Sequence, residues 1–169
     1  MLVFSEYQTD TIDLALDFYG YEDCPKNYEF GPSVRDNFVL HFITKGKGVF
    51  HINKKEIHLE AGDLFLLPKN KVTYYQADAE DPWSYYWIGI SGTKVSDFMR
   101  FSTLHEKGFL KKTEVDTERI GQFMEQLVHK SEASKMTSHY QLHLLSQIYE
   151  LLFLISEVAP DIHRTHPSP

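Results

Sequence analysis

Short apolar segments follow one another between Val34 and Gly92, and Gly, Asn, Asp or Pro separates each from the next. Runs of this kind, rich in β-branched and aromatic residues, are typical of β-strands. They predict strands at residues 38–44, 49–52, 56–59, 64–67, 72–77 and 83–90. No helical pattern interrupts the series, so the expected architecture is an antiparallel sandwich or barrel. A weaker pattern over residues 14–29 predicts further strands.

The periodicity becomes helical after Gly92. Residues 93–101 have apolar positions at helical spacing, and a longer amphipathic helix begins at Asp116 or Thr117. A last helix, at about residues 137–158, has two apolar stripes. The first is Leu142, Leu145, Tyr149 and Leu152, and the second is Leu144, Ile148, Leu151 and Ile155.

A helix that is apolar on two sides must be covered on two sides. The first stripe therefore predicts a homodimer seam, packed like a short coiled coil against a second copy of the chain. The alternative is that this helix lies at the centre of the domain's own core. From Pro160 onward the pattern ends in prolines and histidines, which is typical of a linker.

Composition limits the possible functions. The chain has 169 residues, enough for one hydrophobic core, and a formal net charge of −7. This charge argues against direct binding to a phosphate backbone, which needs clustered Lys and Arg. Cys24 is the only cysteine, so no internal disulfide forms. There is no signal-peptide pattern and no apolar run of membrane-spanning length, so we expect a cytoplasmic protein without a membrane partner.

Catalytic and metal-binding patterns are weak. The helical spacing of His139 and His143 would suit two metal ligands, but a third ligand is not evident. Cys24 has no obvious histidine partner, and no nucleophile elbow or phosphate-binding loop occurs. We expect no catalytic residue, no metal and no cofactor.

The strongest chemical signal is the aromatic segment at residues 83–87. In a strand, Trp83, Tyr85 and Trp87 share one face, whereas Tyr86, Ile88 and Ile90 share the other. An aromatic row inside a barrel can form a flat wall for the C–H face of a sugar, with Tyr hydroxyls supplying hydrogen bonds. Alternatively, the rings simply fill the core, and composition does not decide between the two.

Residues 20–92 resemble the effector-binding half of AraC-family transcriptional regulators, in particular the branch that controls raffinose, melibiose and multiple-sugar operons. The resemblance is carried by Gly20-Tyr21-Glu22-Asp23-Cys24, Gly31-Pro32, Leu40-His41-Phe42-Ile43, Gly46-Lys47-Gly48, Gly62-Asp63-Leu64-Phe65-Leu66-Leu67-Pro68 and Asp81-Pro82-Trp83-Ser84-Tyr85-Tyr86-Trp87-Ile88. The Gly-Asp motif alone occurs in many cupin barrels, whereas its combination with Pro-Trp-x-Tyr-x-Trp is more specific.

The resemblance implies a mainly β fold with some α structure: a cupin-like jelly-roll barrel followed by a C-terminal helical pair. The barrel and an N-terminal arm would occupy residues 1–92, the dimerising helices residues 93–158, and the start of a linker residues 159–169. A DNA-binding domain would follow the linker, so this chain would reach DNA only through a domain that it lacks.

Site residues also follow from the resemblance. Trp87 matches an aromatic residue that packs on the sugar in arabinose-type members, and Tyr75 matches a pocket tyrosine. Tyr85 replaces a histidine of those members, and Arg35 lies near the position of a pocket arginine. Because of these departures we expect a galactoside or another oligosaccharide, with an α-galactoside favoured. His41 and Glu22 complete the expected sugar-binding set.

Two other functions stay open. The first is a cupin enzyme, an isomerase or a dioxygenase. Such enzymes need metal, and Val39 and Thr73 stand where the resemblance places a Glu and a His ligand. The second is a purely structural dimerisation module, whose barrel would be packed solid by its aromatic residues.

Overall fold

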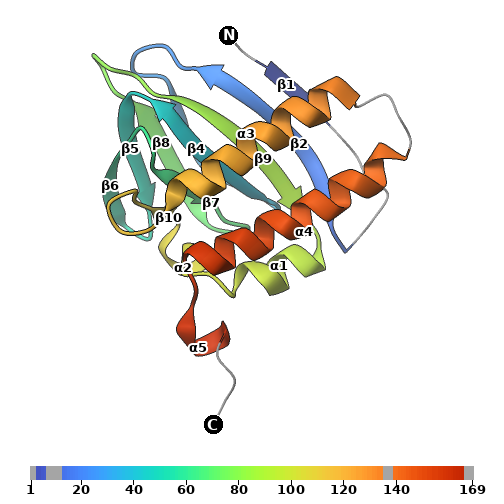
Figure 1. Cartoon of the computed structure of the whole chain (residues 1–169). Helices are drawn as coiled ribbons and strands as arrows, with labels where there is room; N and C mark the ends of the chain where they lie inside the picture. Colours follow the sequence, from blue (N-terminus) through green and yellow to red (C-terminus); the bar gives the residue numbers. More distant parts are fainter. Residues whose placement is uncertain (1–2, 7–12, 135–138, 166–169) are drawn as a thin grey trace.

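The computed structural model describes residues 3–6, 13–134 and 139–165 (Figure 1). Within these ranges, the strands form two antiparallel sheets that pack face to face. The helix-covered sheet has the order β1-β2-β9-β4-β7-β10 and comprises β1 (Val3–Glu6), β2 (Ala15–Asp23), β9 (Ser84–Ser91), β4 (Phe38–Lys45), β7 (Leu64–Leu67) and β10 (Phe109–Leu110). The open sheet has the order β3-β8-β5-β6 and comprises β3 (Glu29–Val34), β8 (Val72–Ala77), β5 (Lys47–Ile52) and β6 (Lys55–Glu60).

The order of the strands defines the fold. Along the chain, β2, β4, β7 and β9 belong to the helix-covered sheet, whereas β3, β5, β6 and β8 belong to the open sheet. The resulting orders, β2-β9-β4-β7 and β3-β8-β5-β6, are those of a jelly roll. The predicted barrel is therefore confirmed, and each of the predicted strands after residue 34 is present. The weak pattern over residues 14–29 corresponds to β2 and the start of β3.

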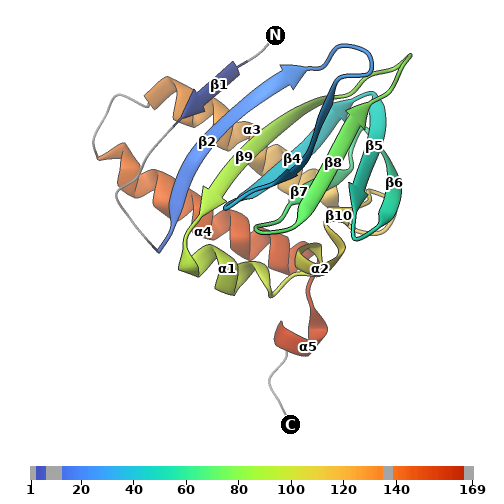
Figure 2. The same cartoon turned by 180° about the vertical axis from the view of Figure 1, so that it is seen from behind.

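Helices cover only one of the two sheets. The described helices are α1 (Thr93–Met99), α2 (Leu104–Lys107), α3 (Thr117–Ser134), α4 (Tyr140–Val158) and α5 (Ile162–Thr165). Figures 1 and 2 show α3 and α4 side by side across the outer face of the helix-covered sheet, with α1 beside α4. Helices α1, α3 and α4 were predicted, whereas the short α2 and α5 were not. Part of the segment expected to be a linker is thus helical, and residues 166–169 lie outside the described ranges. None of the described helices is both long and apolar enough to span a membrane.

Side chains along the central strands point alternately to the two faces of the helix-covered sheet, and they form two separate cores. From β9, Tyr85 and Trp87 join the core inside the barrel, whereas Tyr86, Ile88 and Ile90 join the core beneath the helices. Neighbouring β4 follows the same rule, with His41 on the barrel side and Leu40 on the helix side. The helix-covered sheet is therefore buried on both faces, and it is the row of Trp83, Tyr85 and Trp87 that faces the barrel interior.

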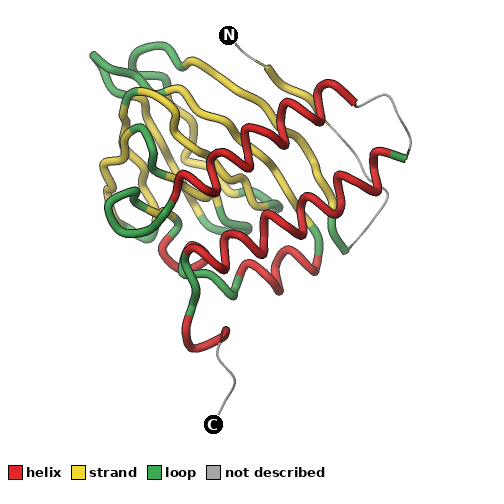
Figure 3. Tube along the Cα trace, in the orientation of Figure 1, coloured by secondary structure: helices red, strands yellow, loops and turns green. Residues whose placement is uncertain are grey.

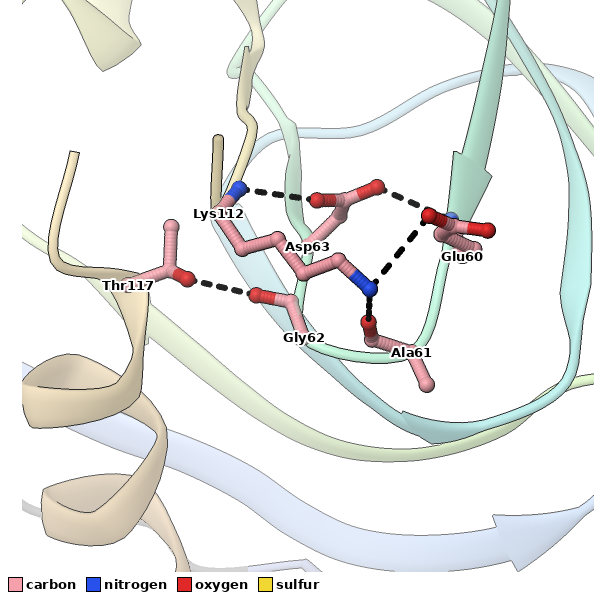
Figure 4. Close-up of polar contacts among 6 residues, drawn as sticks. All are labelled: Glu60, Ala61, Gly62, Asp63, Lys112 and Thr117. Atoms are coloured by element: carbon pink, nitrogen blue, oxygen red, sulfur yellow. Dashed lines mark hydrogen bonds and ion pairs between the residues drawn. The ribbon is translucent and has the colours of Figure 1, made fainter. Parts of the chain in front are cut away.

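The turn at Gly62-Asp63 joins the barrel to the start of α3 (Figure 4). The Asp63 side chain is buried, and its two carboxylate oxygens accept backbone N–H groups of Glu60 and Lys112, each at 2.9 Å. The first residue of α3, Thr117, donates its hydroxyl to the Gly62 carbonyl at 2.6 Å. Gly62 has a φ of +96°, and a Cβ there would lie 2.8 Å from the Lys112 side chain, so glycine suits both the turn and the close approach.

Replacing Asp63 with alanine should lower the free energy of unfolding by about 2 kcal/mol, because two part-buried backbone N–H groups lose a charged acceptor. Chemical denaturation measures this change. Glu60→Gln is the matched control, since it only weakens the 3.3 Å pair between the exposed Glu60 and Lys112 side chains and should cost about 1 kcal/mol or less. Equal destabilisation by the two variants would contradict the role given to Asp63.

Candidate ligand-binding site

One end of the barrel contains a cavity of about 310 Å³. The structure brings all six side chains of the predicted sugar-binding set to its wall: Glu22, Arg35, His41, Tyr75, Tyr85 and Trp87. Five further residues line it that the sequence reasoning did not include: Phe18, Tyr28, Phe30, Val39 and Leu67. The wall thus combines aromatic rings with a small number of polar groups, which is the usual composition of a small-molecule site.

His41 is almost fully buried, with 2% of its surface exposed. Its ring is parallel to that of Phe65 at 4.3 Å, and the Tyr85 ring meets it edge-on at 4.8 Å. Burial lowers the pKa of His41 to about 3, so the ring is neutral at physiological pH. Its buried Nδ1 has no hydrogen-bond partner among the described residues. A buried polar atom without a partner costs free energy.

Tyr75 and Tyr85 place neutral hydroxyls beside this ring. The two rings meet edge-on at 6.2 Å, and burial raises the pKa of both hydroxyls, so they stay protonated. The Tyr85 ring also meets Trp87 edge-on at 5.9 Å. Cys24 contacts Tyr85, and burial raises the pKa of its thiol to about 12, so this cysteine is not a reactive thiolate.

The rim carries two side chains of opposite charge. Glu22 is on β2, opposite Tyr85 of β9, and partial burial raises the pKa of its carboxyl. The Arg35 guanidinium lies 5.3 Å from the centre of the Phe18 ring and 5.9 Å from that of Phe30, within reach of cation–π attraction. Polar and aromatic groups are therefore combined at the rim as well as at the floor.

Phe18 was missed because its strand is irregular. The register of β2 against β9 shifts between Leu16 and Phe18. The regular alternation of inward and outward side chains is therefore interrupted there, and the sequence pattern does not show which way Phe18 points. Phe18 lies opposite Gly89, and a Cβ on Gly89 would come within 2.4 Å of the Phe18 ring. Glycine at this position therefore leaves room for a wall residue of the cavity.

A comparison with known families identifies the domain. The family model described as "AraC-like ligand binding domain" matches residues 15–152. The chain belongs to this family. The matched range contains every residue of the cavity and most of α4, so the AraC-like ligand-binding domain comprises the barrel together with its helices.

Curated relatives of this AraC-like domain are regulatory proteins of bacterial operons. The Msm operon regulatory protein of Streptococcus mutans is 38% identical over 95% of this chain and 57% of the relative. The raffinose operon transcriptional regulatory protein of Pediococcus pentosaceus is 42% identical over 57% of this chain and 36% of the relative. The lactose operon transcription activator of Staphylococcus xylosus is 27% identical over 95% of this chain. The chain therefore spans little more than half the length of the relatives that it matches from end to end.

Among solved structures, YhaK from Escherichia coli matches with a TM-score of 0.46 and 13% identity, over 54% of this chain and 45% of that chain. The cupin domain of Schizosaccharomyces pombe Cnp3 matches with a TM-score of 0.42 and 16% identity, over 59% of this chain and 70% of that chain.

The AraC-like domain has no candidate metal centre in the part of the chain that the structure describes, where no three or more His, Cys, Asp and Glu side chains come together. Val39 lines the cavity and Thr73 is buried on β8. Neither valine nor threonine supplies the nitrogen or carboxylate ligand that a catalytic transition metal needs.

Helix α4 presents an apolar stripe to solvent. Leu142 is 76% exposed, Phe153 is 57% exposed, and Tyr149 lies between them on the same side. Leu145 is half-buried, whereas Leu152 is buried within this chain at 4% exposure. Phe98 of α1 meets Tyr149 at a ring distance of 6.0 Å and widens the stripe. The exposed stripe therefore includes Phe153, which the sequence reasoning omitted, and passes beside Leu152.

His41 makes stability depend on pH. Between pH 6.5 and about 3, the unfolded chain binds a proton at this imidazole that the folded chain excludes, so the folded state loses stability as pH falls. We expect this residue alone to lower the free energy of unfolding by about 2 kcal/mol from pH 7 to pH 5. Urea denaturation at pH 7 and pH 5 measures this change. From pH 7 to pH 5, the free energy of unfolding of the His41→Gln variant should fall by about 2 kcal/mol less than that of the wild type. An unchanged drop would contradict a neutral His41.

Proposed function

We propose that this chain is the effector-sensing and dimerisation domain of a transcriptional regulator of carbohydrate utilisation, and that its cavity binds a small sugar or oligosaccharide. The observation that carries the proposal is the combination, in one cavity, of aromatic rings with neutral hydrogen-bonding groups. An aromatic face matches the C–H face of a sugar, and the imidazole and phenol groups match its hydroxyls. The relatives named for raffinose, Msm and lactose operons support a sugar effector over other small molecules.

Within the cavity, Trp87 would pack against the sugar ring, and His41, Tyr75 and Tyr85 would bond its hydroxyls. Glu22 and Arg35 would bond the hydroxyls nearer the rim. An α-galactoside is the favoured effector, since Tyr85 replaces the histidine of arabinose-type members and one relative is named for the raffinose operon. The relatives' names support a regulator that has no catalytic activity of its own and that acts in the cytoplasm.

The exposed stripe on α4 supports a homodimer. Apolar residues follow one another along this helix at intervals of three or four positions, so they form one seam: Leu142, Leu145, Tyr149 and Phe153. A second copy would cover this seam, with Leu152 supporting it from below. DNA would be bound through a separate domain, and the net charge of −7 on this chain fits a part that does not touch DNA.

Replacing Trp87 with alanine should weaken sugar binding at least about tenfold, because the flat ring wall is lost. Calorimetry with raffinose, melibiose, lactose, galactose and arabinose measures the affinities and ranks the sugars. Tyr74→Phe is the control, since Tyr74 points outward to Glu29 at 2.6 Å and does not line the cavity. Sugar binding that persists unchanged in a folded Trp87→Ala variant would refute the assignment. A wild-type chain that binds none of the sugars would refute the sugar-sensing function.

The double variant Leu142→Glu/Phe153→Glu should sediment as a monomer, because two charges would be buried in the seam. Sedimentation velocity at several concentrations measures the change. His143→Glu adds a charge to an exposed position of the same helix, away from the seam, and should leave the dimer intact. A dimer that survives the double substitution would remove α4 from the interface.

A further inference from the structure

Arg35 is held at the rim of the cavity by a chain of buried or half-buried polar side chains. Its Nε donates to Oδ1 of Asn37 at 3.1 Å, and Nδ2 of Asn37 donates to Oδ2 of Asp17 at 3.2 Å. The other oxygen of Asp17 accepts the hydroxyl of Ser91 at 2.9 Å. Asn37 itself is only 8% exposed. We call the set Arg35, Asn37, Asp17 and Ser91 the rim relay.

With an aspartate at position 17, the chemistry of the rim relay requires an amide at position 37. The neighbour on one side, Arg35, only donates hydrogen bonds, and the neighbour on the other, the Asp17 carboxylate, only accepts them. Asparagine satisfies both because it has one accepting and one donating atom. An aspartate at this position would place two carboxylates in hydrogen-bonding contact, which is strongly unfavourable for a buried pair.

The far end of the rim relay is the point at which the barrel continues into the helices. Ser91 ends β9, and α1 begins two residues later, at Thr93. The same junction is fixed by a backbone bond from Lys94 N–H to the Asp13 carbonyl at 2.8 Å. Helix α1 carries Phe98, which contacts Tyr149 on the exposed stripe of α4. Figure 2 shows β2, the end of β9 and α1 meeting at the same corner of the molecule.

We propose that Asn37 and Asp17 are positioning residues: they orient Arg35 for the ligand and tie its position to the start of α1. The proposal deepens the sugar-binding function, on which it rests where it makes Arg35 a ligand contact. A ligand that draws Arg35 toward itself pulls on Asn37 and Asp17, and through Ser91 on the end of β9. Such a link transmits the effect of ligand binding to α1 only where the ligand binds more tightly to one of two arrangements of the junction between β9 and α1.

A swap of the two side chains tests the rim relay. Asn37→Asp alone should weaken raffinose binding about tenfold or more, because repulsion by Asp17 moves the new carboxylate away and displaces the Arg35 side chain that it binds. Asp17→Asn/Asn37→Asp restores the alternation of donors and acceptors, so its affinity should return to within about threefold of wild type. Asp36→Asn is the control, since exposed Asp36 lies next to Asn37 outside the relay. A double variant as weak as Asn37→Asp would overturn the proposal.

A second measurement needs no ligand and separates this proposal from the sugar-sensing function. In the free protein, Asn37→Ala should speed exchange of the Arg35 Nε proton, seen by NMR. Asn37→Asp should speed amide exchange over residues 93–99, and the swapped pair should restore it. Unchanged exchange in both variants would overturn the rim relay, even if raffinose binds. If the wild type binds no sugar but the exchange changes occur, the sugar-sensing function fails and the relay stands.

Discussion

Burial of the helix-covered sheet on both faces is the constraint on which the rest of the structure depends. On β9, every residue from Ser84 to Ile90 is buried, and successive side chains enter two different cores. A slip of one residue would exchange the rings that line the cavity for Tyr86, Ile88 and Ile90, which pack beneath the helices. The register of β9 is therefore fixed from both sides, and the geometry of the cavity depends on the packing of the helices as much as on the barrel.

The aromatic row that begins at Trp83, just before β9, and continues along this strand is solid core at one end and cavity wall at the other. Trp83 is fully buried and lies nearly parallel to Phe65 at a ring distance of 5.2 Å. Two and four residues further along the strand, Tyr85 and Trp87 line the cavity. The two interpretations that the sequence left open, a filled core and a ring-lined site, thus each describe one part of the same row. Phe65 joins them, since its ring also supports His41 at the cavity floor.

Prediction from sequence succeeded where local patterns were strong. The strands after residue 34 are short apolar runs bounded by turn formers, so they and a sandwich or barrel were predicted, and the resemblance to the AraC family added the jelly roll. Phe18 and Phe30 were missed because irregular pairing interrupts the alternation of β2 and β3, and Tyr28 was missed because it lies in the loop between these strands. Strand β10 was missed because two residues carry no periodicity. On α4, the pattern shows that two sides are apolar, but only the folded packing shows that Leu152 is buried and Phe153 exposed.

Communication between the cavity and the helices is restricted by the same sheet. Neighbouring side chains on β9 point to opposite faces: Trp87 lines the cavity, whereas the Tyr86 hydroxyl lies 3.2 Å from Nε2 of His129 on α3. Because the strand is packed on both faces, a ligand cannot shift or twist the backbone here without disturbing the core beneath the helices, and close-packed interiors resist such changes. The end of β9 is less constrained, since Ser91 is only half-buried and leads directly into α1. Movement of the whole strand end is therefore a less costly route to the helices than rearrangement at its centre.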